Sequence, residues 1–168
     1  MTRFDRPKPP VKPGSSLPWL AAMALLSAGA VAAALVSQHV YNMQPCPWCV
    51  LQRAIFVVIA LACMVGLLWR SAAGRVVSAS LIFLLASSGV AAAAWQHFVA
   101  AKSASCNLTL ADKIVTALKL DTLMPAVFSA TASCADAAVN LLGVPYDFWA
   151  LGAFAILALM GLRQLFKG

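Results

Sequence analysis

Four long apolar runs constrain the fold of this chain more than any other feature. They lie near Leu17 to Val40, Val50 to Trp69, Val76 to Phe98 and Phe148 to Phe166. A helix of roughly 20 residues crosses a hydrocarbon core about 30 Å thick, which matches the lengths of these runs. Backbone polar groups in lipid must be hydrogen bonded within the protein, and the runs lack the strict alternation of barrel strands. The sequence therefore predicts an all-α membrane protein built on a bundle of four transmembrane helices.

Composition and charge support a membrane protein with a defined orientation. Of 168 residues, 62% are hydrophobic and only 10% are charged, against roughly 25% charged in soluble domains. The side that would carry both termini holds one acid, Asp5, and these bases: Arg3, Arg6, Lys8, Lys12, Arg70, Arg75, Arg163 and Lys167. On the other side, bases and acids balance: Arg53, Lys102, Lys113 and Lys119 against Asp112, Asp121, Asp136 and Asp147. Short cytoplasmic loops retain Lys and Arg, so both termini are predicted to be cytoplasmic. This orientation accounts for the net charge of +7, and no nucleic-acid partner is predicted.

This topology divides the chain into a tail, four spans and two outer loops. Residues 1–16 form a Pro-rich basic cytoplasmic tail, and residues 17–168 form the membrane domain. The first span is expected to be retained, because its apolar core exceeds the roughly 7 to 15 residues of a signal peptide. The outer loops cover about 41–49 and 99–147. In the long loop, apolar residues recur at helical spacing and predict a short amphipathic helix, either on the membrane surface or packed on the bundle ends: Leu110, Ile114, Val115 and Leu118.

Four of the five cysteines fall on the outer side, where disulfides persist: Cys46, Cys49, Cys106 and Cys134. Four cysteines allow three pairings. The lower entropy of closing short loops favours Cys46 with Cys49 and Cys106 with Cys134. No metal site is expected, because a four-thiolate zinc site usually has two close pairs, whereas 27 residues separate the second two cysteines. The fifth, Cys63, is predicted to pack inside the second span.

The first pair stands where the second apolar run begins, in Pro45-Cys46-Pro47-Trp48-Cys49. Two thiols at this spacing form a reducible disulfide, and the start of a helix stabilises a thiolate. Arg53 follows Cys49 by four residues, so it shares that helix face and would lower the pKa of the thiol or stabilise a bound anion. Snorkelling to the headgroups is its alternative role. This segment indicates thiol redox chemistry at a membrane surface; a non-catalytic scaffold with structural disulfides is the alternative.

Two histidines, His39 and His97, end the first and third spans on the same outer side. Paired at one depth, they could ligate a b-type haem, which makes an electron-carrier subunit a second alternative. Interfacial hydrogen bonding is their more common role. Attachment of a c-type haem is excluded, because Val50 and not His follows the cysteine pair.

Taken together, these residues resemble the DsbB family of inner-membrane disulfide-generating proteins. The resemblance covers nearly the whole chain after the tail. It rests on Gln38-His39-Val40, on Pro45-Cys46 and Cys49 with Arg53, on the long loop with Cys106 and Cys134, and on Leu142-Gly143 before the last span. It implies an oxidoreductase that reoxidises a periplasmic DsbA-like dithiol protein and passes the electrons to ubiquinone or menaquinone.

The resemblance also implies roles for individual residues. Cys106 matches the cysteine that the partner's thiolate attacks, and Cys134 matches its mate, which then attacks Cys46 and frees Cys49 to face the quinone. Arg53 matches an arginine that supports the quinone, and His97 more loosely matches a histidine near it. The active cysteines are accordingly expected on the periplasmic side of the inner membrane, and both termini in the cytoplasm.

Overall fold

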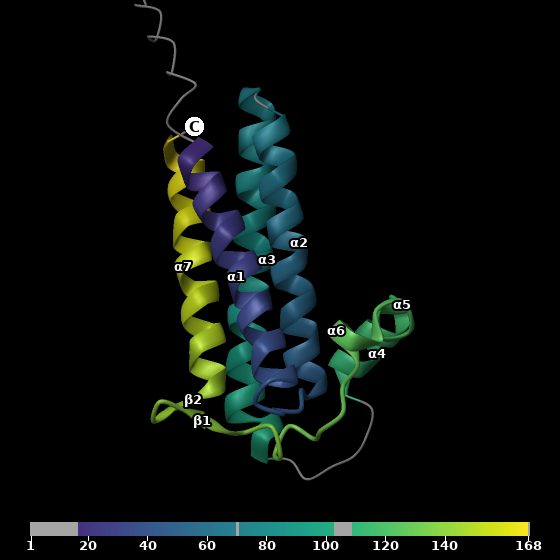
Figure 1. Cartoon of the computed structure of the whole chain (residues 1–168). Helices are drawn as coiled ribbons and strands as arrows, with labels where there is room; N and C mark the ends of the chain where they lie inside the picture. Colours follow the sequence, from purple (N-terminus) through teal and green to yellow (C-terminus); the bar gives the residue numbers. More distant parts are fainter. Residues whose placement is uncertain (1–16, 70, 103–108, 168) are drawn as a thin grey trace, which may run out of the picture.

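Four long helices form the body of the protein. The computed structural model describes residues 17–69, 71–102 and 109–167, so Cys106 and the predicted tail lie outside it. The long helices are α1 (Leu17–His39), α2 (Pro47–Leu68), α3 (Ala72–Phe98) and α7 (Tyr146–Lys167). They run side by side, with the start of α1 and the end of α7 at the upper end of the bundle in Figure 1. All four are long and apolar enough to cross a membrane, which confirms the predicted all-α bundle.

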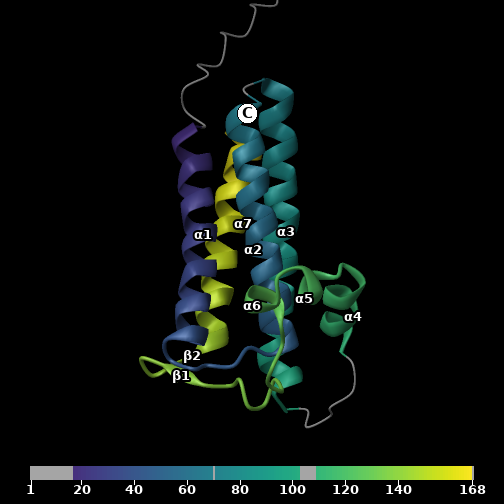
Figure 2. The same ribbon diagram turned by 45° about the vertical axis from the view of Figure 1, so that its right-hand side comes forward.

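The helices are packed in the order α1, α2, α3, α7. Contact between α1 and α7 is much less extensive than contact between the other adjacent pairs of helices. Figure 2 shows the same helices after a 45° turn. The side chains of Met23, Ile59, Ile82 and Leu157 are fully buried between them. Phe56 of α2 stacks on Phe154 of α7 with ring centroids 3.9 Å apart. The core therefore joins all four helices, while the contact between α1 and α7 stays loose.

Helix α2 begins three residues before the predicted span. Cys46 is its N-cap, with extended backbone, and its sulfur accepts a hydrogen bond from the Cys49 amide at 3.3 Å. Pro47 occupies the first helical position, where a missing N–H costs nothing and the fixed φ suits a helix. Cys49 consequently lies in the first turn of α2 and not in the loop before it.

Most of the long outer loop folds against the outer half of α2. After a 3-10 turn at Ala100–Lys102, it contains α4 (Leu110–Ala117), α5 (Leu120–Leu123) and α6 (Pro125–Phe128), which lie beside α2 in both views. The expected amphipathic helix is α4, and a capping box between Thr109 and Asp112 starts it.

One face of α4 is packed on the bundle and another is not. Val115 and Phe128 form a small core with Val50 and Ala54 of α2. Leu110 and Leu118 remain exposed. Of the two arrangements predicted for this helix, packing on the bundle accounts for its buried face.

A two-stranded hairpin connects the loop to the last helix. Strands β1 (Asn140–Leu141) and β2 (Val144–Pro145) are antiparallel. Leu142 and Gly143, with φ of 54° and 80°, form the two-residue turn, as expected for a type I′ hairpin. The Tyr146 amide then donates to the Val139 carbonyl at 2.9 Å. This bond fixes the entry into α7, which starts at Tyr146 and so includes Asp147 in its first turn.

Candidate thiol exchange site

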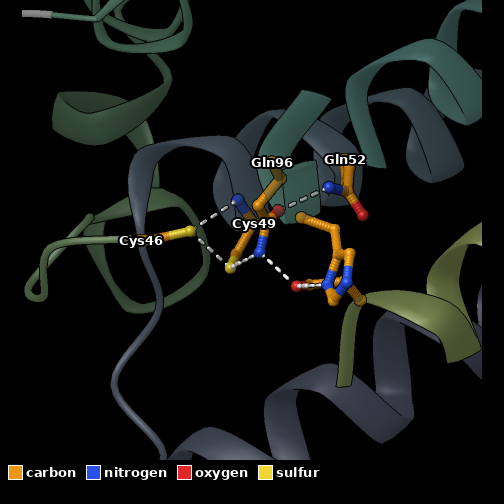
Figure 3. A network of polar contacts seen from close by, with 6 residues as sticks. Cys46, Cys49, Gln52 and Gln96 are labelled. Carbon is orange, nitrogen blue, oxygen red and sulfur yellow. Dashed lines mark hydrogen bonds and ion pairs between the residues drawn. The ribbon is translucent and has the colours of Figure 1, made fainter. Parts of the chain in front are cut away.

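Three cysteine sulfurs meet at the outer end of the bundle. The Sγ atoms of Cys46 and Cys49, both present as thiols, are 2.6 Å apart (Figure 3). The sulfur of Cys134 is hydrogen bonded to Cys46 from the other side. Cys46 and Cys134 are buried in one cluster with Trp48 and Ala111. Cys46 is thus the central member of the group, with one sulfur on each side of it.

Backbone hydrogen bonds hold the long loop against the short one at this point. The amides of Thr131 and Ala132 both donate to the Pro45 carbonyl, at 3.0 and 3.2 Å. The Thr131 hydroxyl also donates to the side chain of Gln44 at 2.6 Å. These bonds tie residues 131–132 to the residue just before Cys46, which brings Cys134 to its sulfur.

The hydrogen bonds within this group separate the proton affinities of Cys46 and Cys134. The Cys46 thiol lies against the sulfurs of Cys134 and Cys49, and its hydrogen bonding to them together with burial raises the pKa of Cys46. The pKa of Cys134 is lowered, first by the bond from Cys46 and also by the backbone N–H of Trp48, although burial opposes the shift. Cys134 is therefore the better thiolate of the two, which is the property that an attacking sulfur needs.

A buried amide lies beside Cys49 (Figure 3). Gln96 of α3 is 2% exposed, and its Nε2 donates to the Cys49 sulfur at 3.3 Å and to a carboxylate oxygen of Asp147. Its Oε1 accepts from Nε2 of Gln52 at 2.6 Å. The Asp147 carboxylate, 4% exposed, continues the chain to Nδ1 of His97 at 3.4 Å. Gln96 of α3 and Asp147 of α7 thus connect Cys49 to His97, whose side chain is 30% exposed.

Arg53 is buried against α1 and α6 and does not extend to the headgroups. Only 5% of the surface of Arg53 is exposed. The guanidinium donates to the Gln38 side chain, to the Val127 carbonyl at 3.0 Å and to the Ala34 carbonyl at 3.2 Å. No carboxylate is paired with it among the residues that the structure describes. Such a cation, without a counterion in this part of the chain, is suited to a ligand that carries or develops negative charge.

A cavity of about 450 Å³ joins Cys49 and Arg53. Gln52, Gln96 and Asp147 provide the other polar groups of its wall. The rest is small and apolar, chiefly from α1 and α7: Leu25, Leu26, Gly29, Ala30, Ala33, Ala34, Ala150 and Ala153. A mostly apolar hollow with a few convergent polar groups is typical of a site for a small organic molecule.

A second, larger groove of about 1060 Å³ is lined by Cys134 and not by Cys49. It runs between the outer halves of α2 and α3 and helix α4, and Cys134 lines one end of it. The two hollows therefore approach the sulfur group from different sides, one at Cys49 and one at Cys134.

The two histidines and the remaining cysteines have different surroundings. His97 does not line the Cys49 cavity but touches Asp147, which does. His39 is hydrogen bonded through Nε2 to the Ala126 carbonyl at 3.2 Å, so the two histidines have separate protein partners. Cys63 is buried in the bundle core, as expected. The predicted contact between Cys106 and Cys134 lies outside the described residues.

Asp147, Gln96 and Gln52 are the residues that sequence reasoning missed as a group. Asp147 had a usable signal, because an acid at the start of an apolar run is costly in a membrane and usually functional. The glutamines had none, since their importance comes from contacts across 44 and 51 positions of sequence.

Fold and site together define a multi-pass membrane protein with redox-capable thiols gathered at one end of a four-helix bundle. The sequence model of the family described as "Disulfide bond formation protein DsbB" matches residues 16–163. The chain belongs to this family of membrane disulfide-forming oxidoreductases, as the sequence resemblance predicted.

Curated relatives agree along most of the chain. A "Disulfide bond formation protein B" of Herminiimonas arsenicoxydans is 33% identical over 154 residues, covering 91% of this chain and 97% of the relative. One of Burkholderia pseudomallei (strain 1106a) is 34% identical over 140 residues, covering 83% of each. A "Disulfide bond formation protein B 1" of Pseudomonas savastanoi is 32% identical over 143 residues, covering 84% of this chain and 85% of the relative.

Proposed function

We propose that this protein reoxidises a periplasmic DsbA-like dithiol protein and transfers the electrons to a membrane quinone, ubiquinone or menaquinone. The observation that carries the proposal is the central position of Cys46, between Cys134 on one side and Cys49, in the wall of the cavity, on the other. Electrons entering from a soluble partner and leaving into the bilayer need a junction of this kind.

The thiol steps follow from which sulfur can attack which. The partner's thiolate attacks Cys106 of a Cys106–Cys134 disulfide, and Cys134 leaves. Cys134, whose thiolate the Trp48 backbone N–H also stabilises, then attacks Cys46 of a Cys46–Cys49 disulfide, which frees Cys49 as a thiolate. The hydrogen bond between Cys134 and Cys46 supports this order, because the attacking and attacked sulfurs are already neighbours.

The Cys49 cavity fits a quinone in size and lining. A quinone supplies an acceptor for two electrons and two protons. Cys49 and Arg53 would hold such a group, the Arg53 guanidinium would stabilise negative charge that develops on it, and the apolar wall from α1 and α7 would exclude water. His97 acts through Asp147 and not by direct contact. The orientation follows the charge asymmetry, with cysteines periplasmic and both termini cytoplasmic in a bacterial inner membrane.

The test is oxidation of a reduced thioredoxin-like partner by the purified protein in lipid, with added ubiquinone and substoichiometric protein. We expect many turnovers with the wild type and none when Cys46, Cys49, Cys106 or Cys134 is replaced by Ser. Cys63→Ser is the matched control and keeps full turnover, because Cys63 is remote from the sulfur group. Undiminished turnover in Cys49→Ser would exclude the mechanism, and oxidation of no more than one equivalent by the wild type would favour a scaffold.

A further inference from the structure

The hydrogen bonds that connect Cys49 to His97 have no role in the thiol exchange steps proposed above. Gln52 fixes the orientation of the Gln96 amide, because Gln52 Nε2 donates to Gln96 Oε1 at 2.6 Å. Both N–H groups of Gln96 are therefore directed away from Gln52. One of these N–H groups points to the Cys49 sulfur and one to Asp147. Two groups that are each able to become anions therefore share a single buried amide.

Sharing one neutral amide makes the two charges compete. A thiolate on Cys49 and a carboxylate on Asp147 cannot both be stabilised well by Gln96, since like charges in a buried site disfavour each other. Besides Cys49, the other ionisable groups around Asp147 are Cys134, His97 of α3, and Arg53 and Tyr146, which line the same cavity. Arg53 has its own three acceptors. His97 is the one with both a hydrogen bond to Asp147 and an exposed surface.

We propose that Asp147 is the proton-exchanging residue of the Cys49 cavity, loaded from the outer aqueous side through His97 when Cys49 becomes a thiolate. The inference rests on the proposed function, in which Cys49 is that thiolate. It adds a residue that delivers protons to a thiol-based electron path.

Electrons and protons balance over one cycle. When Cys134 attacks Cys46, the sulfur–sulfur bond between Cys46 and Cys49 breaks and Cys49 carries the electron pair. A proton from water passes to His97 and on to Asp147, which becomes neutral. The Cys106 thiolate, released when the partner forms its own disulfide, attacks Cys134, which re-forms the Cys106–Cys134 disulfide and frees Cys46 as a thiolate. Cys46 and Cys49 then bond to each other again as an electron pair passes to the acceptor in the cavity, and the proton leaves Asp147 for the same acceptor. A second proton follows by the same route, so that two electrons and two protons are transferred.

The first measurement requires no quinone. In a Cys106→Ser, Cys134→Ser background, infrared difference spectra between the oxidised and the reduced Cys46–Cys49 pair should show a protonated carboxyl band on reduction. Asp147→Asn should remove that band and Asp147→Glu should shift it. Asp121→Asn, which removes an acid from the same side of the membrane outside the polar chain, should leave it unchanged. A band that persists in Asp147→Asn, or no band in the wild type, overturns the proposal.

The second measurement separates proton delivery from thiol exchange. In Asp147→Asn, turnover with ubiquinone should fall by about a hundredfold, as expected for loss of a positioned proton donor. Oxidation of one equivalent of partner without quinone should still occur, which also shows that the variant is folded. Asp147→Glu should recover most of the turnover, and His97→Gln, which keeps a hydrogen-bonding side chain but cannot relay a proton, should lower turnover.

The outcomes distinguish the two proposals. Wild-type turnover in Asp147→Asn over the whole pH range overturns the role of Asp147 and leaves the proposed function standing. A wild type that oxidises no partner with quinone contradicts the proposed function, while the infrared band still decides whether Asp147 takes up a proton.

Discussion

At the scale of single residues, the sulfurs differ because of their neighbours and not because of their spacing. The proton of Cys46 is held between neighbouring sulfurs, whereas Cys134 accepts a hydrogen bond from Cys46 and one from the Trp48 backbone. The sequence predicted that Cys49 and Arg53 share a face, and both do line one cavity. The order of Cys134 and Cys46 came only from the family resemblance, because their proximity depends on two backbone bonds to Pro45 across more than 80 positions.

A first prediction concerns the pH dependence of Cys134. Its pKa is lowered chiefly by the hydrogen bond from Cys46, so in fully reduced protein its alkylation should already be half-maximal below the ordinary thiol pKa of about 8.5. Cys46→Ala removes the donor, the thiolate loses that stabilisation, and the midpoint should move to higher pH. Iodoacetamide labelling followed by mass spectrometry measures each site separately.

The control for this experiment is Cys63→Ala, which leaves the sulfur group intact and should not move the midpoint. An unchanged midpoint in Cys46→Ala would mean that the Trp48 amide alone sustains the thiolate, and it would remove the reason for giving Cys134 the attacking role.

At the scale of elements, the helices were predictable because they are dictated by apolar length, whereas their starts depend on local caps. Pro47 and the N-cap at Cys46 move the start of α2 outward, and the hairpin ending at Pro145 fixes the start of α7. These shifts of a few residues decide that Cys49 and Asp147 are helical and lie opposite each other in one cavity. A hydropathy pattern averages over such details and cannot resolve them.

A second prediction concerns the packing of α3 on α7. A Cβ added to Gly89 would lie 2.4 Å from the Phe154 ring, which is itself fully buried. Gly89→Ala should therefore destabilise the bundle by about 1–3 kcal/mol through overpacking. Thermal unfolding in detergent, followed by circular dichroism, measures the effect.

Gly152→Ala on α7 is the matched control, because a Cβ there meets nothing within 4 Å. It should leave the fold unchanged or stabilise it by about 0.5–1 kcal/mol, as Ala does relative to Gly in a helix. Equal unfolding temperatures for the two variants would show that α3 and α7 can separate freely at this level.

At the scale of the whole molecule, the hairpin and α4 to α6 lie toward one end of the bundle, opposite the start of α1 and the end of α7 (Figure 1). The sulfur group is at the start of α2, at the same end as the hairpin. At the opposite end, the Arg163 guanidinium lies 4.7 Å from the centre of the Trp19 ring. Among the described bases that are predicted to face the cytoplasm, Arg75 near the start of α3 and Arg163 near the end of α7 both lie at this end.

A third prediction follows from this polarity. Green fluorescent protein fused after Gly168 should fluoresce in a bacterial host, because it folds in the cytoplasm. The same protein inserted between Leu142 and Gly143, at the exposed tip of the hairpin, should be exported unfolded and stay dark. The reverse pattern would invert the orientation and assign the thiols to a reducing compartment.

The sparse contact between α1 and α7 determines how the protein would meet its electron acceptor. The wall of the Cys49 cavity includes Leu25 of α1, which is 74% exposed. In the predicted topology this part of α1 crosses the bilayer, so we expect the proposed acceptor to enter the cavity from the acyl chains. An acceptor arriving by this route is dissolved in two dimensions. The rate should follow its mole fraction in the lipid, obey surface dilution when plain phospholipid is added, and ignore the volume of the surrounding buffer.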